Sequence, residues 1–273
     1  MALVVQHNIT SLNTNRQLGI TTGNQAKSAE KLSSGYRINR AGDDAAGLSI
    51  SEKMRSQIRG LNKASSNAQD GVSLIQTAEG ALNEVHSILQ RMNEIATQAA
   101  NDTNTSTDRT ALREEMDQLQ NEINRIQSTT QFNSMNLLSG SFKGKNLQVG
   151  ALSGQAISIS ISKMTASNIG VGGSLKIDGF TNAGKTMSKV QAAISFVSKQ
   201  RSKLGAIQNR LEHTIANLNT TSENTSAAES RIRDIDMAAE MVEYSKNNIL
   251  AQAGQSMLAQ ANQSTQGVLS ILG

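Results

Sequence analysis

The 273-residue chain contains no proline, no cysteine and no tryptophan, and only 2% of its residues are aromatic. The absence of cysteine excludes disulfide bonds, zinc sites with cysteine ligands and thiol catalysis. A long helix needs the absence of proline, because one interior proline costs roughly 3 kcal/mol. With few aromatic rings to fill a globular core, Leu, Ile, Val, Met and Ala remain for narrow helix-to-helix contacts. The composition therefore favours long packed helices over an enzyme core.

Charge and hydropathy exclude further classes of partner. The net charge is +4 and only 18% of residues are charged, so the chain does not demand an anionic partner. The basic stripe of Arg55, Arg59 and Lys63 has acids interspersed, which favours a solvated face over a nucleic-acid site. No run approaches the ~18 apolar residues of a membrane span. The N-terminus also lacks the pattern of a cleaved secretory signal, so export would need another route. We expect no nucleic-acid partner and no membrane insertion.

No cluster of residues predicts catalysis. The three histidines are far apart and lack metal-type spacing. Asp43 and Asp44 are explained better as a helix cap than as an acid–base pair. The segment from Gly42 to Gly47 lacks the lysine and the strand–loop–helix context of a phosphate loop. We therefore expect no catalytic residue, no cofactor and no metal.

The clearest pattern is a helical seam in residues 43–99, where apolar or small residues recur in steps of three and four. A period near 3.5 predicts a left-handed packing seam, in a helix on the order of 80 Å long. A second row beside the first predicts a bundle of three or four helices. The first row is Met54, Ile58, Leu61, Ser65, Ala68, Val72, Ile75, Ala78, Leu82, Val85, Leu89, Met92, Ala96 and Ala99, and the second is Leu74, Ala81, Ile88 and Ile95.

The first helix is predicted to begin near Val5 and to end at Gly35, which can adopt the left-handed conformation of a C-terminal cap. Asp43 and Asp44 are expected at the start of the next helix, as N-cap and first-turn acid. One side of the first helix carries small and apolar residues that permit the close approach of another helix. These residues are Ile9, Leu12, Gly19, Gly23, Ala26 and Ala29.

The middle of the chain changes from helical to strand periodicity. A shorter helix is predicted around 112–126, after which Leu147 and Val149 alternate with polar residues, as do the isoleucines of 157–161. A period of two indicates strands with one buried face, and the many glycines indicate turns. Residues 130–184 are therefore predicted to form a small β-rich region.

Helix is expected to return near Lys185, with an apolar stripe from Val190 to Leu218 in which Arg201 takes one position. A polar connector is predicted near 222–236, followed by a final helix with an unbroken four-three pattern. That pattern comprises Met237, Met241, Tyr244, Asn248, Ala251, Gly254, Leu258, Ala261, Thr265, Val268 and Leu272.

These patterns predict a mainly α fold, an elongated helical bundle or coiled-coil rod built from paired N- and C-terminal halves, with a small β-hairpin-rich central region. Ordering each residue costs about 1–2 kcal/mol, and the terminal helices are rich in Ala, Gly, Ser, Asn and Gln. We therefore expect both ends to be disordered in the isolated chain and to fold against neighbouring copies. The expected divisions are 1–42 and 233–273 for the two halves of an inner terminal domain, 43–140 and 185–232 for the halves of a rod domain, and 141–184 for a short variable region.

Long stretches at both ends resemble the signatures of bacterial flagellin. The resemblance spans roughly residues 1–140 and 185–273. The N-terminal signature is the run Glu30–Leu48, and the C-terminal signature is divided among Leu204–Leu211, Ala228–Asp234, Lys246–Leu250 and Met257–Gln263.

This resemblance implies a short-form flagellin without large outer domains, which polymerises with itself into the extracellular filament of the motile flagellum. It also implies passage through the flagellar type III export apparatus, an export chaperone on the last helix, and contacts with filament cap and junction proteins. The residues expected to serve polymerisation or chaperone binding are Met241, Leu250, Met257, Leu258, Val268, Leu269, Ile271 and Leu272.

The segment 89–98 resembles the patch through which family members are bound by Toll-like receptor 5. Arg91, Ile95 and Gln98 are spaced so that one helix face can present them together. At Leu119 the chain departs from strongly recognised members, some of which have arginine there. In the alternative interpretation, Ile95 packs inside the bundle. The implied receptor-binding residues are Arg91, Glu94, Ile95, Gln98 and Glu115.

Two other functions remain open at this point. A hook–filament junction protein of the flagellum shares terminal features with flagellin, although not usually the full signatures. A cytoplasmic helical signalling hairpin would also be built from long seams of this kind.

Overall fold

The computed structural model of the chain describes residues 8–173 and 175–272, with side chains placed through Ser264. The chain divides into two compact units, one formed by the two ends up to Ser56 and from Asn224, the other by 57–223. The mainly α fold class is confirmed. The helices are α1 (Ile9–Ser34), α2 (Ala45–Ala99), α3 (Ser106–Thr129), α4 (Phe180–Arg233) and α5 (Met237–Leu272), and the strands are β1 (Gln131–Phe132), β2 (Met135–Asn136), β3 (Lys145–Gln148) and β4 (Ala156–Ile159).

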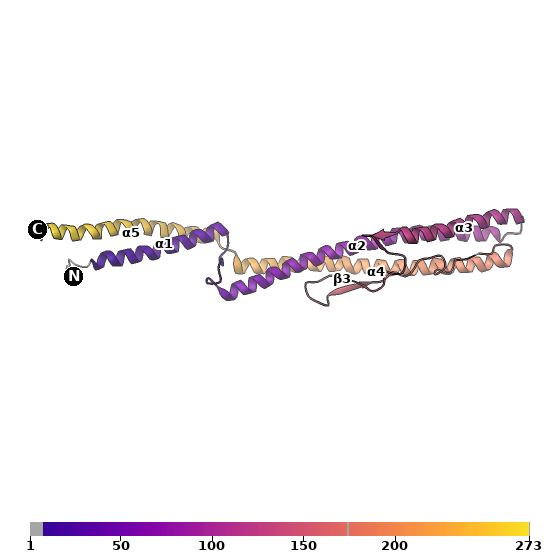
Figure 1. The fold of residues 1–273 in the computed structure, drawn as a ribbon, viewed down its shortest axis with the longest axis horizontal. Helices are drawn as coiled ribbons and strands as arrows, with labels where there is room; N and C mark the ends of the chain where they lie inside the picture. Colours follow the sequence, from indigo (N-terminus) through magenta and orange to yellow (C-terminus); the bar gives the residue numbers. More distant parts are fainter. Residues whose placement is uncertain (1–7, 174, 273) are drawn as a thin grey trace. The chain divides into compact units, whose positions relative to one another are not determined.

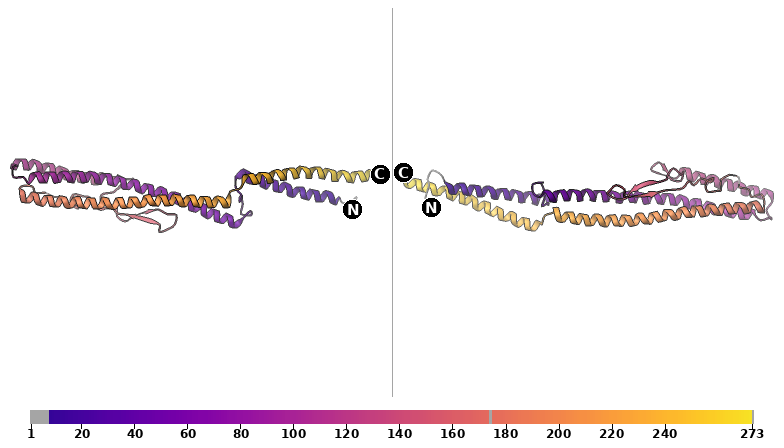
Figure 2. Two further views of the ribbon diagram at one scale, coloured as in Figure 1. Left: turned by 180° about the vertical axis from the view of Figure 1, so that it is seen from behind. Right: turned by 90° about the horizontal axis from the view of Figure 1, so that it is seen from below.

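In the unit formed by 57–223, α2, α3 and α4 run side by side (Figures 1 and 2). Both predicted rows of α2 contribute to one apolar core with α3 and α4, which confirms the bundle inferred from the double seam. Each fully buried Leu, Ile, Val or Met side chain in such a core contributes about 1.5–3 kcal/mol. The buried residues of α4 within its predicted stripe recur every seven positions: Val190, Val197, Leu204, Leu211 and Leu218.

Polar side chains tie α2 to α4 where the apolar seam is weak. The Ser65 hydroxyl donates to Asn219 Oδ1 at 3.0 Å, and the Ser222 hydroxyl donates to Asn62 Oδ1 at 2.8 Å. These bonds lie where α4 enters the predicted connector of residues 222–236, and that prediction is wrong for 222–233, which are helical. The segment has no proline or glycine to end a helix, so α4 continues to Arg233.

The start of α3 has a reciprocal N-terminal cap. The backbone N–H of Asp108 donates to the Thr105 hydroxyl oxygen, and the backbone N–H of Thr105 donates to the Asp108 carboxylate at 2.9 Å. Hydrogen bonds from the hydroxyl and backbone N–H of Thr105 lower the pKa of Asp108 below its usual value. Two otherwise unpaired helix donors are therefore satisfied within one turn.

Two antiparallel hairpins, β1–β2 and β3–β4, follow α3. In β4 the predicted alternation is confirmed, because Ile157 and Ile159 are buried while Ala156 and Ser158 are exposed. The β3–β4 hairpin lies against glycines of α2: a Cβ at Gly71 would stand 2.3 Å from Leu147 Cδ2, and one at Gly60 would stand 2.9 Å from Ala151 Cβ. Glycine at these two positions lets the hairpin approach the helix closely.

In the unit formed by the two ends, α1 and α5 lie side by side (Figures 1 and 2). Helix α1 begins at Ile9, where the Asn8 side chain accepts from the Ser11 N–H at 2.9 Å. The predicted start near Val5 lies outside the described residues. Gly35 ends α1 with φ 75°, which confirms the left-handed C-terminal cap.

Candidate functional site

The face that α1 turns toward α5 is largely polar. The Ser11 hydroxyl donates to Asn262 Oδ1 at 2.8 Å, the Gln25 amide donates to Asn248 Oδ1 at 3.4 Å, and Leu18 lies against Gly254. Between Ile9 and Ser34, the less exposed positions in steps of three and four are Ser11, Thr14, Leu18, Thr21, Gln25, Ser28 and Leu32. Only two of these seven residues are large and apolar, so this seam buries little apolar surface.

The seam predicted on α1 does not face α5. Ile9, Leu12, Gly19, Gly23, Ala26 and Ala29 are all exposed, and no heavy atom lies within 4 Å of a Cβ built at Gly19 or Gly23. A single sequence shows that a helix has an apolar side but not which chain covers that side, and the sequence pattern named no partner for this one. The small residues leave this stripe open to the close approach of another helix.

Helix α5 follows its predicted four-three pattern only in part. Tyr244, Asn248, Gly254 and Leu258 are half-buried and Ala251 and Ala261 are buried, whereas Met237 and Met241 are exposed. Of the predicted polymerisation residues, Met241, Leu250 and Met257 are exposed and Leu258 is half-buried. The side chains of Val268, Leu269, Ile271 and Leu272 lie outside the described residues.

Three further exposed apolar residues, Ile20 on α1 and Val242 and Ile249 on α5, were missed by reasoning from the sequence. They lie off the four-three pattern on which that reasoning depended. They could have been found by looking for large apolar residues outside the four-three pattern of a helix, since such residues indicate a second surface to be covered.

An open groove runs between α1 and α5. Its walls include Leu18, Ile20, Leu250 and Met257. Asn247 also lines it, and although this residue is only 4% exposed, its amide nitrogen has no hydrogen-bond partner. Polar residues such as Asn13, Gln17 and Lys246 share the walls with these apolar side chains, and a mixed surface of this kind suits an amphipathic helix.

The segment that follows the C-terminus of α1 and the segment that precedes the N-terminus of α5 are bound to each other. Tyr36 pairs with Asp234 in an isolated antiparallel bridge, and the Ile235 N–H donates to the Gly35 carbonyl at 3.1 Å. The Arg233 guanidinium lies 4.7 Å from the centroid of the Tyr36 ring, in the range of a cation–π contact. These contacts hold the adjoining ends of the helix pair together.

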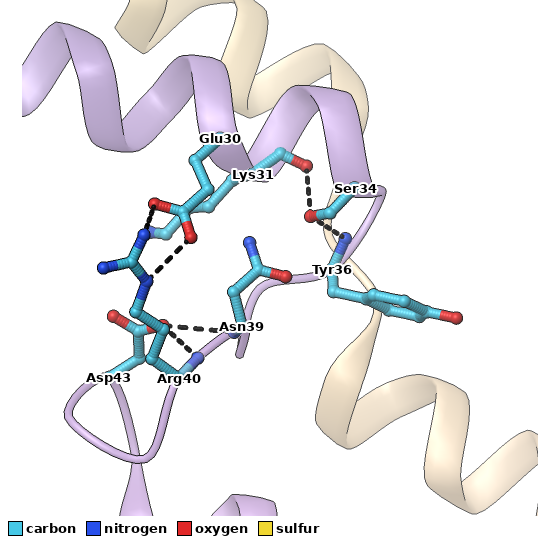
Figure 3. Close-up of polar contacts among 7 residues, drawn as sticks. All are labelled: Glu30, Lys31, Ser34, Tyr36, Asn39, Arg40 and Asp43. Atoms are coloured by element: carbon cyan, nitrogen blue, oxygen red, sulfur yellow. Dashed lines mark hydrogen bonds and ion pairs between the residues drawn. The ribbon is translucent and has the colours of Figure 1, made fainter.

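The loop between α1 and α2 is closed by charged groups (Figure 3). The Arg40 guanidinium pairs with Glu30 at 3.0 Å, and the Asp43 carboxylate accepts from the backbone N–H groups of Arg40 at 2.9 Å and Asn39 at 3.1 Å. These backbone hydrogen bonds lower the pKa of Asp43 below its usual value. Asp43 is therefore a loop-closing residue, which corrects its expected place in the helix start.

Asp44 caps α2 on its own. Its side chain accepts from the Gly47 N–H at 2.8 Å, and its carbonyl accepts from the Leu48 N–H at 2.9 Å. This is the geometry of an N-cap three residues before the bonded donor.

Four of the five predicted receptor residues form one surface on α2 and α3. Arg91 bonds Glu115 at 2.8 Å and Glu94 at 3.2 Å, and Gln98 is exposed further along α2. The hydrogen bonds, first to Glu115 and then to Glu94, raise the pKa of Arg91 above its usual value. The result is an exposed patch with one cation held between two carboxylates.

Ile95 does not belong to that patch, because its side chain is 0% exposed in the apolar core. About 40° of helical rotation separates it from Arg91, and that rotation carries it from the surface into the seam. The helix face expected to present Arg91, Ile95 and Gln98 together therefore presents only Arg91 and Gln98 to the surface.

The described residues offer no cluster of three or more His, Asp or Glu side chains suited to a metal ion. Among the described helices, none combines the length and hydropathy needed to cross a membrane.

Known proteins match this chain along nearly all of its length. Residues 5–143 match the family model of the bacterial flagellin N-terminal helical region, and residues 187–272 match that of the C-terminal helical region. A flagellin of Halalkalibacterium halodurans is 55% identical over 271 residues, which cover 99% of this chain and 100% of that protein. A flagellin of Bacillus subtilis is 51% identical over 302 residues, covering 98% of this chain and 99% of that protein. The crystal structure of Bacillus cereus flagellin is 31% identical with a TM-score of 0.49, covering 60% of this chain and 94% of that one.

Proposed function

This chain belongs to the bacterial flagellin family and is a structural subunit of the extracellular flagellar filament, not an enzyme, and from that premise we propose how it enters the filament. The outward faces of α1 and α5 bind neighbouring copies, and the two helices become ordered as they do so. The motile filament is thus a homopolymer held by surfaces that a single copy leaves uncovered.

The observation that carries this proposal is the distribution of apolar residues over the terminal helix pair. The α1 side of the seam is mainly Ser, Thr and Gln and the α5 side is rich in Asn, Ala and Gly, whereas Ile9, Leu12, Ile20, Ile249 and Leu250 are exposed. Soluble single chains rarely leave a large contiguous apolar surface uncovered, and such surfaces mark protein–protein contacts. Neighbouring copies supply the cover that this pair lacks.

The same distribution supports coupled folding. The helices contain 26 and 36 residues, and ordering each residue costs about 1–2 kcal/mol. Few large apolar side chains are buried between α1 and α5 to offset that cost, in contrast to the continuous core around α2. The paired helices of the structure represent the ordered state, and we propose that contacts between copies supply the missing stabilisation.

The test is an Asp substitution at Leu250, which lines the groove between α1 and α5. Leu250→Asp is expected to raise the critical concentration for filament formation at least tenfold, because it places a charge on the surface to be buried. Leu250→Met is the matched control and should assemble as the parent chain does. Normal assembly of the Asp variant would place the contact surface elsewhere.

Hydrogen exchange tests whether α1 and α5 become ordered only on assembly. Hydrogen exchange of the dilute chain should show rapid exchange throughout α1 and α5 and protection of α2, with protection of α1 and α5 appearing in filaments. Strong protection of both terminal helices in the dilute chain would contradict coupled folding.

We further propose that the surface of Arg91, Glu94, Gln98 and Glu115 binds Toll-like receptor 5. Support comes from the resemblance of segment 89–98 to the receptor-binding patch of the family and from the accessibility of these side chains, since Arg91, Glu94 and Gln98 are exposed and Glu115 is half-buried. Ile95 supports the surface from within the core.

Arg91→Ala should weaken receptor binding by at least several-fold, because it removes the central cation of the patch. Arg125→Ala is the matched control, since Arg125 is an exposed arginine of α3 paired with Glu122 at 2.6 Å. Equal losses for the two variants would show a general charge effect and refute the assignment.

Before assembly, we propose, the exposed apolar side of α5 is covered by an export chaperone that delivers the chain to the flagellar type III export apparatus. The described residues that would bind it are the exposed Met241, Leu250 and Met257 and the half-buried Leu258. Cap and junction proteins would meet the same surface at the filament ends. Titration of the chaperone against Leu250→Asp should show a dissociation constant at least tenfold higher than that of Leu250→Met.

A further inference from the structure

We propose that the methionines of α5 are a modification site for peroxide-class oxidants, and that their oxidation to the sulfoxide blocks addition of the subunit to a filament. The proposal rests on the proposed function, because it needs the outward side of α5 to be buried on assembly. The residues are Met237, Met241 and Met257.

The structure separates the methionines into accessible and inaccessible groups. Met237, Met241 and Met257 are 48%, 52% and 62% exposed, whereas Met92, Met116 and Met164 are each 0% exposed in the core of the other unit. Oxidation of methionine follows the accessibility of its sulfur. A single chain therefore contains reactive methionines on an assembly helix and protected ones as an internal reference.

The chemistry needs only an external peroxide. The thioether sulfur attacks one peroxide oxygen, an S–O bond forms, the O–O bond breaks, and hydrogen peroxide is reduced to water as methionine is oxidised to its sulfoxide. The chain has no cysteine, so no thiol competes for the oxidant. A sulfoxide reductase with a thiol reductant returns the oxygen as water and restores the thioether.

The position of these side chains on α5 means that their oxidation would affect the contact with a neighbouring copy. Met257 lines the groove beside Ile20 and Leu250, where a neighbouring helix is expected. Sixteen residues separate Met241 from Met257, so they point in directions about 160° apart around α5. A neighbour on either flank of the helix therefore covers at least one of them. The sulfoxide replaces a flexible apolar group with a strong polar acceptor, which is costly to bury without a donor.

The first measurement follows oxidation of the full chain by hydrogen peroxide, with each methionine read by peptide mass spectrometry. In the dispersed chain, Met241 and Met257 should oxidise at least tenfold faster than Met92, Met116 and Met164. In preformed filaments the rate should fall at least tenfold at Met241, at Met257 or at both. Equal rates at the exposed and core methionines, or unchanged rates in filaments, would overturn the proposal.

The second measurement compares assembly before and after oxidation. The oxidised chain should need at least a tenfold higher critical concentration, while the circular dichroism of the folded core is unchanged, and sulfoxide reductase should restore assembly. The variant with Met237→Leu, Met241→Leu and Met257→Leu should assemble and resist peroxide, whereas Met135→Leu, which removes an exposed methionine of β2, should remain sensitive.

Loss of assembly by the triple Leu variant under peroxide would overturn the proposal, as would oxidised parent chain that assembles normally or is not rescued by the reductase. If the triple variant fails to assemble even without peroxide, the test becomes the parent chain alone: sulfoxide reductase must restore its assembly after oxidation for the proposal to stand. Failure of the untreated parent chain to assemble would instead refute the proposed function.

Discussion

Truncation of Leu12 to alanine tests whether the exposed stripe of α1 holds copies together. The Leu12 residue is 65% exposed, and full burial of a leucine contributes about 1.5–3 kcal/mol. If assembly buries the exposed share, the truncation removes about 1–2 kcal/mol of association energy per subunit. At 1.4 kcal/mol per factor of ten, the critical concentration should rise about 5- to 30-fold.

A matched control exists because Leu152, in the loop between β3 and β4, is 68% exposed. Leu152→Ala removes the same atoms from a similarly exposed position outside the terminal helix pair, and it should leave assembly unchanged. Neither variant should alter the thermal unfolding of the dispersed chain, since exposed side chains contribute little to it. Critical concentrations are read from sedimentation of filaments over a dilution series. Equal values for the two variants, or an effect of Leu12→Ala explained by lower chain stability, would refute the reasoning.

Three further changes probe the folded units. Gly71→Ala should destabilise the docked β3–β4 hairpin by about 1–3 kcal/mol in hydrogen exchange, because the added Cβ would stand 2.3 Å from a side-chain carbon. Gly80→Ala is the control: its added Cβ meets no atom within 4 Å, so it should stabilise α2 by about 0.5–1 kcal/mol. Leu89→Ala should lower the free energy of denaturant unfolding by about 2–5 kcal/mol, because it leaves a cavity in the bundle core. The loop held by Asp43 should be stable above pH 3.8, the ordinary pKa of its carboxyl, and should loosen as the pH falls through the lowered folded value, because protonation removes the acceptor of the Arg40 N–H. That last change is followed by amide chemical shifts, and Asp43→Asn should abolish the pH dependence.

The core around α2 could be predicted because its partners lie in the same chain. Apolar residues such as Leu82 and Leu89 recur with a period near 3.5, and a second row that includes Ile88 signalled more than one partner helix. Ile95 is a member of that second row and also lies only about 40° around the helix from the exposed Arg91, so the sequence supported both a core position and a place in the surface patch. Only the packing of α3 and α4 decides that question.

The polar segments were harder to predict for a different reason. Residues 222–233 have the composition of a loop, but side-chain hydrogen bonds such as that from Ser51 to Glu229, at 3.1 Å, help to hold this part of α4 against α2. The α1–α5 seam shows the same effect, because Gln25 lies outside the row predicted for α1 and its amide nevertheless donates to Asn248, which belongs to the predicted pattern of α5. Periodicity of apolar residues carries no information about contacts made by amides and hydroxyls.

The polar seam also has a physical consequence for assembly. Hydrogen bonds at defined positions, such as the one from Asn8 to the Ala261 carbonyl at 2.9 Å, specify the register of two helices more strictly than interchangeable apolar contacts do, at a cost in stability. A filament repeats one contact between unlike surfaces of successive copies, so every copy must present its outward stripe in the same register. In the proposed assembly, apolar residues on the outer side of the pair supply affinity between copies, and polar residues between α1 and α5 fix the register in which each copy presents its outer side. Replacing Ser11 and Gln25 by leucine should therefore strengthen the isolated helix pair in hydrogen exchange while producing shorter, less regular filaments in electron micrographs, and long regular filaments from that variant would refute this division of roles.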